Sequence, residues 1–298
     1  MELTQLRAFR AVAQHKSYTR AAKELFLTQS AVSQQMAALE EELGCDLFEQ
    51  VGKKTQLTSA GEHFLTYTHR ILTLEHEARE SLDDFKQGAK GRVTIAAISS
   101  TTLYLLPDLL AKFRVRHPDV DIVLRTAGGD EVKDMVARGA VDVGIIGSHV
   151  STKEFVSAYL FHDRISPFVS RKHRLSRKRR IRFAELANDP MILLGPWKSW
   201  QDYVLAIFRQ ADIKPQIHLQ LESIDAVKRM VERNLGFTIL PHISCRAEVK
   251  AKSLVPLQFT DVPSLDREIL LIHRKDKQVS QILQRFIDFV VEEARRFR

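Results

Sequence analysis

The sequence of 298 residues lacks the features that would suit it to an oxidising or membrane environment. Its two cysteines, Cys45 and Cys245, are too few for a disulfide framework. No uncharged apolar stretch reaches the roughly 18 residues needed to span a bilayer. The first ten residues carry charges where a signal peptide would be apolar. We therefore expect a cytoplasmic protein and exclude the secreted, collagen-like and membrane-spanning classes.

Motifs of catalysis and cofactor binding are also missing. The 11 histidines show neither an HExxH pattern nor a paired Cys/His spacing for a metal ion, and there is no GxGxxG, GxSxG or P-loop sequence. We therefore expect no enzymatic activity, no cofactor and no metal. Neither cysteine has a second cysteine nearby in the sequence to resolve an oxidised thiol, which disfavours a redox switch.

Proline is absent from residues 1–90, and only three glycines precede Gly88, which favours helices throughout this region. Ser17 is expected to cap a short helix, and Thr28 a second one that Gly44 ends. The apolar face of the second helix consists of Val32, Met36, Leu39 and Leu43. Two short helices with a tight junction suggest a helix-turn-helix, although an ordinary helical hairpin fits the same pattern. In the first case the polar side chains at the start of the second helix would reach base edges in the major groove, namely Gln29, Ser30, Ser33 and Gln34.

A longer apolar stripe follows, within residues 59–87. Its members recur at helical spacing with polar residues on the other faces, which indicates a long helix that pairs with a partner or lies on the core of its own domain. We favour pairing, because little chain is nearby to cover the stripe. The stripe consists of Phe64, Tyr67, Ile71, Leu74, Ala78, Leu82 and Phe85.

Beyond a glycine-containing break at residues 88–91, strands alternate with helices. Strands are expected at 93–98, 120–125, 141–146, 191–194, 217–221, 237–240 and 268–273. Helices are expected at 103–116, 130–138, 200–210, 223–233, 242–249 and 279–296. This order calls for a parallel sheet with helices on its faces. Two similar α/β units are expected, the second inserted between parts of the first.

The net charge of +8 is unevenly distributed. Residues 1–90 contain 11 Lys and Arg against 13 Asp and Glu, whereas residues 91–298 contain 34 against 24. The segment 171–182 alone carries eight Lys and Arg. A solvated surface loop is the commoner explanation for such a run, and flanking DNA or an acidic partner is the alternative.

The motifs of the first 61 residues form one series, at residues 6–9, 17–22, 27–33, 39–40, 43–44, 47–48 and 57–61. Together they closely resemble the winged helix-turn-helix of LysR-type transcriptional regulators. The later chain is similar to the effector-binding part of this family at residues 106–107, 113, 118, 139–142 and 236–241. Gln50 departs from the family, which often has Arg there, and so removes a charge near the wing.

The resemblance implies a mixed fold: a mostly α-helical, winged helix-turn-helix domain with a long linker helix, followed by an α/β effector domain of two subdomains like a periplasmic binding protein. We expect the DNA-binding domain at 1–58, the linker helix for dimerisation at 59–87, a hinge at 88–91 and the effector domain at 92–298. Subdomain I would comprise about 92–162 and 267–298, and subdomain II about 163–266.

The implied function is sequence-specific transcriptional regulation under the control of a small, anionic metabolite. The partners would be promoter DNA, RNA polymerase and other copies of the chain, as a dimer or a tetramer of two dimers. The DNA-binding residues would include Arg20, the residues Thr28, Gln29, Ser30, Ser33 and Gln34 around the start of the second helix, and Lys53 and Lys54, whose charges would face the DNA backbone. An enzyme or small-molecule binding protein on the α/β fold without DNA function is the alternative.

The effector cleft is expected beyond the C-terminal ends of the strands, where ligands bind in open α/β sheets. Hydroxyls at a helix N-terminus suit an anion, although one of them could simply cap the helix. The expected lining residues are Ser99, Ser100, Thr101, Gly147, Ser148, Trp197, Ser199 and Ser223.

Overall fold

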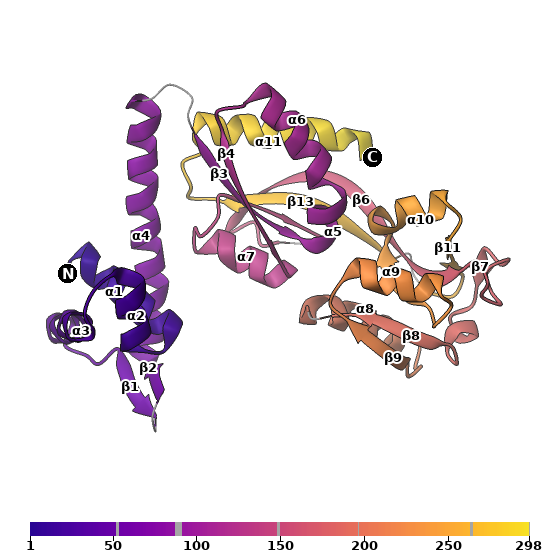
Figure 1. Ribbon diagram of the computed structural model, residues 1–298, viewed down its shortest axis with the longest axis horizontal. Coiled ribbons are helices and arrows are strands. Elements are labelled where there is room, and N and C mark those ends of the chain that lie inside the picture. The colour runs from indigo at the N-terminus through magenta and orange to yellow at the C-terminus, as the bar shows by residue number, and fades with distance from the viewer. Residues whose placement is uncertain (52–53, 87–90, 148–149, 196, 263–264, 298) are drawn as a thin grey trace. The chain divides into compact units, whose positions relative to one another are not determined.

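The computed structural model describes residues 1–51, 54–86, 91–147, 150–195, 197–262 and 265–297. The chain divides into two compact units, one of Met1–Gly88 and Arg138–Ala140 and one of Ala89–Ala137 and Val141–Arg298. The first unit is mostly helical and the second is α/β (Figure 1). The expected mixed fold class is thus confirmed.

The N-terminal unit contains three short helices, a β-hairpin and a long helix. In chain order these are α1 (Leu3–His15), α2 (Tyr18–Leu25), α3 (Gln29–Leu43), β1 (Phe48–Val51), β2 (Lys54–Leu57) and α4 (Ser59–Lys86). The expected helix ends are confirmed. The Ser17 hydroxyl accepts a hydrogen bond from the Arg20 backbone N–H, and that of Thr28 accepts one from Ala31. Gly44, at φ 69°, ends α3 in the left-handed conformation that glycine tolerates.

The hairpin corrects the expectation of an almost entirely helical region, although the family resemblance implied a wing. Strands of four residues are too short to show a periodic signal against helical neighbours. The hairpin joins the core through aromatic packing. The Phe9 ring lies 5.2 Å from the Phe48 ring and 5.1 Å from the Phe64 ring.

Helix α4 divides its apolar stripe between two environments. Phe64 packs into the core of its own unit, so its assignment to the pairing seam is wrong. Further along, Tyr67 is 47% exposed and Leu74 65% exposed, while Ala78 is exposed and Ile71 half-buried. The side chains of Leu82 and Phe85 lie outside the described residues. The seam that needs a cover therefore begins at Tyr67.

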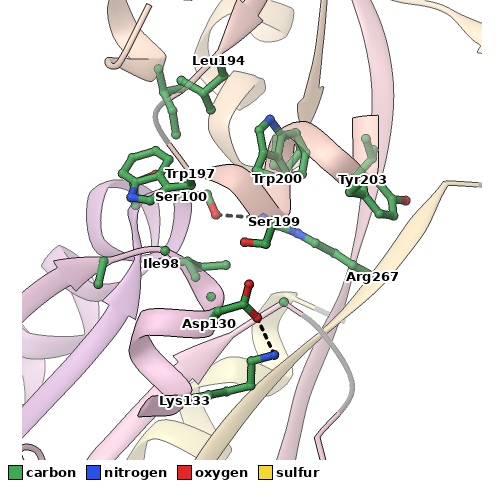
Figure 2. A pocket seen from close by; sticks show the side chains of 18 residues that line it. Ile98, Ser100, Asp130, Lys133, Leu194, Trp197, Ser199, Trp200, Tyr203 and Arg267 are labelled. Atoms are coloured by element: carbon green, nitrogen blue, oxygen red, sulfur yellow. Dashed lines mark hydrogen bonds and ion pairs between the residues drawn. The ribbon is translucent and has the colours of Figure 1, made fainter. Parts of the chain in front are cut away.

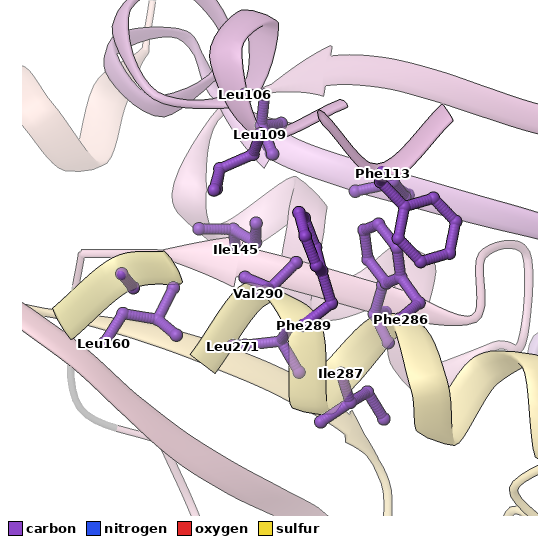
Figure 3. Packing of buried hydrophobic residues seen from close by; sticks show 14 of the residues in the cluster. Leu106, Leu109, Phe113, Ile145, Leu160, Leu271, Phe286, Ile287, Phe289 and Val290 are labelled. Carbon is purple, nitrogen blue, oxygen red and sulfur yellow. The ribbon is translucent and has the colours of Figure 1, made fainter. Parts of the chain in front are cut away.

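The C-terminal unit consists of two subdomains. The first contains β3 (Arg92–Ile98), α5 (Ser99–Tyr104), α6 (Leu106–Arg116), β4 (Asp121–Ala127), α7 (Gly129–Ala137), β5 (Val143–Ile146), β13 (Asp266–Arg274) and α11 (Gln281–Ala294). Strands β4, β3 and β5 are parallel, and β13 pairs antiparallel to β5. Helices α6 and α11 cover one face of the sheet and α7 covers the other (Figure 1). Phe113 of α6 meets Phe286 and Phe289 of α11 at ring distances of 5.1 and 5.3 Å (Figure 3).

The second subdomain repeats this layered arrangement with smaller sheets. Its elements are β7 (Arg180–Ile181), the 3-10 turn η1 (Phe183–Leu186), β8 (Pro190–Leu194), α8 (Lys198–Gln210), β9 (Gln216–Leu221), α9 (Ile224–Glu232), β10 (Thr238–Pro241), the 3-10 turn η2 (His242–Cys245), α10 (Arg246–Lys250), β11 (Leu254–Pro256) and β12 (Gln258–Phe259). Strands β8 and β9 are parallel, with α8 and α9 packed on separate hydrophobic clusters.

Two long strands, β6 and β13, connect the subdomains, and the sequence patterns did not predict β6. Strand β6 (Phe155–Ser170) has no expected counterpart in the sequence, because its polar residues and Pro167 break both the alternating and the continuous apolar pattern. Its first half pairs with β13 and its second half with β10 and β11. The expected helix 103–116 is instead two helices, α5 and α6, that meet at Leu105.

A buried charge network joins α5 of the first subdomain to α9 and α10 of the second. Lys228 is 4% exposed. Its ammonium lies 2.9 Å from a carboxylate oxygen of Asp225 and 2.8 Å from one of Glu248. The Tyr104 hydroxyl donates to Asp225 at 2.7 Å, and the Lys228 ammonium lies over the Tyr104 ring. Burial lowers the pKa of Lys228, but its hydrogen bonds to Glu248, Tyr104 and Asp225 outweigh this and raise it overall.

Within the described part of the chain, no helix is long and apolar enough to cross a bilayer.

We expect Lys228→Met to lower the free energy of unfolding by about 3 kcal/mol, because methionine fills the space but leaves the largely buried carboxylate of Glu248 without its cation. Denaturant titration of the full chain measures this. Arg229→Gln is the matched control on the same helix: its side chain is 75% exposed in a surface ion pair, so the expected change is about 0–1 kcal/mol. Equal losses in the two variants would contradict a structural role for the network.

Candidate functional site

The exposed face of α3 carries hydrogen-bonding side chains at its N-terminal end. Gln29 Nε2 donates to Ser33 Oγ at 3.0 Å, and the hydroxyls of Thr28 and Ser30 lie 3.0 Å apart. The opposite face is anchored by Val32, Met36 and Leu39, each 0–1% exposed. Because the anchored face determines the helix orientation, the polar side chains point to solvent, where a major groove can receive them.

The other expected DNA-binding residues are placed as follows. Arg20 on α2 and Gln34 on α3 are exposed, as are Thr28, Gln29 and Ser30, whereas Ser33 is half-exposed. Lys53 and the Lys54 side chain lie outside the described residues. Gln50 donates a hydrogen bond to Thr55 across the hairpin at 3.2 Å. The structure thus gathers the expected α3 residues on one accessible face.

A pocket of about 170 Å³ lies between the two subdomains of the C-terminal unit. The C-terminal ends of β3, β4 and β5 contribute from one side, and the end of β8 and the start of α8 from the other. Three aromatic side chains of the second subdomain, Trp197, Trp200 and Tyr203, form much of that wall (Figure 2). The position agrees with the general rule for open α/β sheets.

Arg267, at the start of β13, is a charged residue of the pocket whose side chain is held by several neighbouring groups. Its Nη2 donates to Ser100 Oγ at 2.8 Å (Figure 2). The same Nη2 lies 2.9 Å from Asp163 Oδ2. Asp163 on β6 is 3% exposed and also accepts from the Ile243 backbone N–H. The guanidinium stacks over the Trp200 ring at 5.7 Å. These contacts hold the Arg267 side chain in one orientation, so its remaining N–H groups are preorganised for a ligand.

Two glycines make room for these side chains. A Cβ atom at Gly147 would lie 2.8 Å from Arg267 Cδ, and one at Gly128 would lie 2.7 Å from Trp197 Cδ1. Atoms that are not bonded do not approach so closely. A larger residue at either position would therefore force the side chain of Arg267 or Trp197 to move.

Most of the expected effector residues line this pocket, but not all. Ser99, Ser100, Gly147, Trp197 and Ser199 do so, and Ser148 lies outside the described residues. Thr101 does not. It is 0% exposed, and its hydroxyl donates to the Ile98 carbonyl at 2.9 Å. Ser223 does not line the pocket either, because its hydroxyl caps α9 by accepting from Ala226. Both were expected as lining residues, and both serve local helix structure instead.

Several lining residues were not expected from the sequence. They are Asp130 and Lys133 on α7, paired at 2.7 Å, together with Trp200, Tyr203 and Arg267. Lys133 and Asp130 lie one helical turn apart, so this pair could have been found from its spacing. Arg267 could not, because nothing in its neighbourhood in the chain points to Ser100 or Asp163.

The pocket offers hydroxyls and charged groups that can bind a polar ligand. Its described lining includes neither histidine nor cysteine. Among the residues with described positions, no group of three or more His, Cys, Asp or Glu could hold a metal ion.

Of the cysteines, Cys45 is exposed and Cys245 is buried. Burial raises the pKa of the Cys245 thiol to about 12, which suppresses its reactive thiolate.

Comparison with known proteins yields two family matches that together cover nearly the whole chain. Residues 3–62 match the bacterial regulatory helix-turn-helix of the lysR family, and residues 86–295 match the LysR substrate binding domain. The chain is 31% identical to the RuBisCO operon transcriptional regulator of Allochromatium vinosum, over 99% of this chain and 97% of that protein. It is 30% identical to the HTH-type transcriptional activator CmpR of Synechocystis sp., over 97% and 94% of the two chains.

Solved structures agree. The crystal structure of CbnR, a LysR family transcriptional regulator, superposes with a TM-score of 0.66 at 26% identity, covering 99% of both chains. The Synechocystis CcmR regulatory domain, solved in complex with 2-PG, shares the fold at 20% identity and a TM-score of 0.63, covering 68% of this chain and 97% of that one. With both family matches, the helical N-terminal unit and the two-subdomain pocket in one chain, this protein belongs to the LysR family of transcriptional regulators.

Proposed function

We propose that this regulator binds a small anionic metabolite in the pocket between the subdomains, and that binding changes how the protein holds promoter DNA. The observation that carries this proposal is Arg267. Its guanidinium is oriented by a buried carboxylate and a serine hydroxyl and lies at the pocket wall. An arginine oriented in this way suits the planar oxygens of a carboxylate or phosphate.

The remaining lining supports an anion of modest size. Arg267 and Lys133 are the cations of its described lining and Asp130 is the anion, while Asp163, the partner of Arg267, lies outside the lining. Ser99, Ser100 and Ser199 offer hydroxyls that can donate to oxygen. The cavity of about 170 Å³ is smaller than the roughly 300–1,000 Å³ of drug-sized ligand pockets. A compact carboxylate or phosphate ester fits this combination.

Regulation follows from the fact that both subdomains line the pocket. A ligand that touches Ser100 on one side and Ser199 on the other binds best at one angle between them, so it shifts the population toward that angle. The size of the response is limited by the difference in ligand affinity between the two states. In an assembly of several copies, such a change alters the relative placement of the reading helices and the bend imposed on the promoter.

The assembly we propose is a dimer through α4, and a tetramer of two such dimers. Exposed Tyr67, Leu74 and Ala78 continue along one face of a helix of 28 residues, about 40 Å long. A second copy of the helix covers such a seam symmetrically. We further propose that the protein acts in the cytoplasm with RNA polymerase as a partner, and that it neither catalyses a reaction nor needs a cofactor.

For DNA recognition, we expect Gln29→Ala and Ser33→Ala each to reduce the discrimination between operator and random DNA by about 1–3 kcal/mol per lost base contact. The measurement is a binding titration at fixed salt with the upstream region of the protein's own gene as the operator probe. Glu41→Ala, at an exposed position near the C-terminal end of α3, is the control and keeps full discrimination. Unchanged discrimination in both variants would show that α3 does not read the bases through this pair.

For assembly, we expect Leu74→Asp to dissociate the dimer while leaving each chain folded. Leu74 is 65% exposed within the chain, so the substitution costs the monomer little, whereas in the dimer it buries an unpaired charge. Thr66→Asp places the same charge on an exposed position of another α4 face and leaves the dimer intact. Light scattering measures mass, and footprinting measures protection of the two half-sites. A wild-type mass for Leu74→Asp would mean that the copies do not pair through this seam.

For the effector, we expect Arg267→Gln to weaken binding of the anion by roughly ten- to a hundredfold, since hydrogen bonds to charged groups contribute about 1.5–3 kcal/mol. Binding is measured by calorimetry of the full chain with a panel of inorganic phosphate, sulfate, small carboxylates and phosphate esters. The panel includes 2-PG as a probe. Thr101→Val is the control, since it removes a hydroxyl of the same pocket-forming helix that points away from the pocket, and it keeps wild-type affinity.

Two further results bear on the effector proposal. If Arg267→Gln proves unstable, Ser100→Ala removes only the hydroxyl that accepts from Arg267 and still weakens binding by a few-fold. Anion binding that is equal in wild type, Arg267→Gln and Ser100→Ala would place the anion elsewhere. An uncharged metabolite that binds the wild type while no anion does would overturn the proposed ligand class.

A further inference from the structure

The strongest concentration of charge in the molecule lies outside both the reading helix and the pocket. Residues 163–266 contain 18 Lys and Arg against 11 Asp and Glu, a net of +7 out of +8 for the whole chain. Within them, the segment 171–182 has eight cations and no acidic residue, and six of the eight are arginine. The segment connects β6 to η1 in the second subdomain.

The structure separates these cations into two groups. Arg174 is paired with Asp189 at 2.8 Å, and Lys178 is paired with Glu185. The other six are exposed and form no ion pair with any described residue. We call this second group the basic surface: Arg171, Lys172, Arg177, Arg179, Arg180 and Arg182.

The basic surface is presented by an anchored backbone. Leu175 and Ile181 of the same segment are 2% and 1% exposed, in the hydrophobic core of the second subdomain. Strand β7 pairs with β12, and the Arg171 backbone N–H donates to the Ser253 carbonyl. The exposed Lys250 and Lys252 come shortly before Ser253 in the chain. A segment tied down at both ends keeps its cations together, so a polyanion that binds them meets little ordering cost in the backbone.

A protein does not need a cluster of charges of one sign to be soluble. Soluble surfaces usually intersperse both signs, and six neighbouring cations without carboxylate partners repel one another. A polyanion removes this repulsion by neutralising the charges. Arginine, the majority here, also forms bidentate hydrogen bonds to phosphate.

We propose that the basic surface binds the phosphate backbone of double-stranded DNA, independently of sequence, in addition to the base contacts of α3. The N-terminal unit explains why such a contact is useful. Residues 1–90 have 11 cations against 13 acids, so this part of the chain attracts phosphates weakly as a whole. Non-specific DNA binding comes almost entirely from phosphate neutralisation. A cationic surface elsewhere in the chain supplies what the reading unit lacks.

The test compares two triple variants of the full chain. The first, Arg177→Gln, Arg179→Gln and Arg180→Gln together, neutralises half of the basic surface without touching the Arg174 and Lys178 ion pairs. The control, Arg114→Gln, Lys153→Gln and Arg285→Gln together, removes the same charge from exposed positions of the first subdomain. Circular dichroism and the anion affinity of the pocket verify that both variants fold.

The measurement is the affinity for a long random-sequence duplex as a function of salt. Each phosphate contact contributes about 0.9 to the slope of log affinity against log salt concentration. We expect the slope of the first variant to be shallower than that of the wild type by about 2–3, and its affinity at about 0.1 M salt to fall by tenfold or more. The control keeps the wild-type slope. The ratio of operator to random affinity stays near wild type in both, because α3 is unchanged.

Equal slopes for the wild type and the first variant would overturn the proposal. An equal loss of DNA affinity in both variants would also overturn it, because the loss would then come from the net charge of the whole protein and not from this surface. A third result would also overturn it: normal DNA binding by the first variant combined with loss of transcription by purified RNA polymerase would assign the surface to an acidic protein partner.

Discussion

The pocket of this protein depends on one buried ion pair, between Arg267 of β13 and Asp163 of β6. The two strands run side by side between the subdomains, and the pair lies where they pass from one to the other. Asp163 also accepts from the backbone of Ile243, and Arg267 donates to Ser100. One pair thus connects the starts of η2 and α5 with the two connecting strands. A charge pair taken out of water costs more than it returns unless all its hydrogen bonds are made, which is why these neighbours are positioned so closely around it.

A second polar connection, the network around Lys228, links the same subdomains at another point. It joins the end of α5, whose first residues line the pocket, to α9, whose first residue Ile224 also lines it. The two connections share α5, which begins at the pocket with Ser99 and Ser100 and ends at Tyr104. Polar contacts at both points therefore help to hold the subdomains in this arrangement. Such contacts are more directional than apolar packing, and they can favour one angle over another when a ligand changes the geometry.

Hydrogen-bonding groups on α3 and the excess of cations lie in different parts of the chain. Helix α3 offers uncharged hydrogen-bonding groups, which suit base edges, while the cations are concentrated in the second subdomain of the C-terminal unit. Base contacts specify and phosphate contacts add affinity, and these are separable tasks. Helix α3 itself has no Lys or Arg, and its only charged residues are Glu40, Glu41 and Glu42 near its C-terminal end. The net charge of the whole chain therefore says little about where sequence is read.

The amino-acid sequence by itself predicted most features that depend on neighbouring residues in the chain. The caps at Ser17 and Thr28, the end of α3 at Gly44, the helical period of α4, the parallel strands and several pocket serines all follow from patterns within a few residues. Such patterns did not predict the short hairpin or the long strand β6. They also did not predict that the Thr101 hydroxyl donates to the Ile98 carbonyl or that Phe64 packs in the core of its own unit. Only the tertiary structure decided these, and only it brought Arg267 to Ser100 across 167 positions of sequence. The physical reason is that caps and periods depend on neighbours in the chain, whereas the partner of a buried charge is chosen by the packing of whole strands and helices.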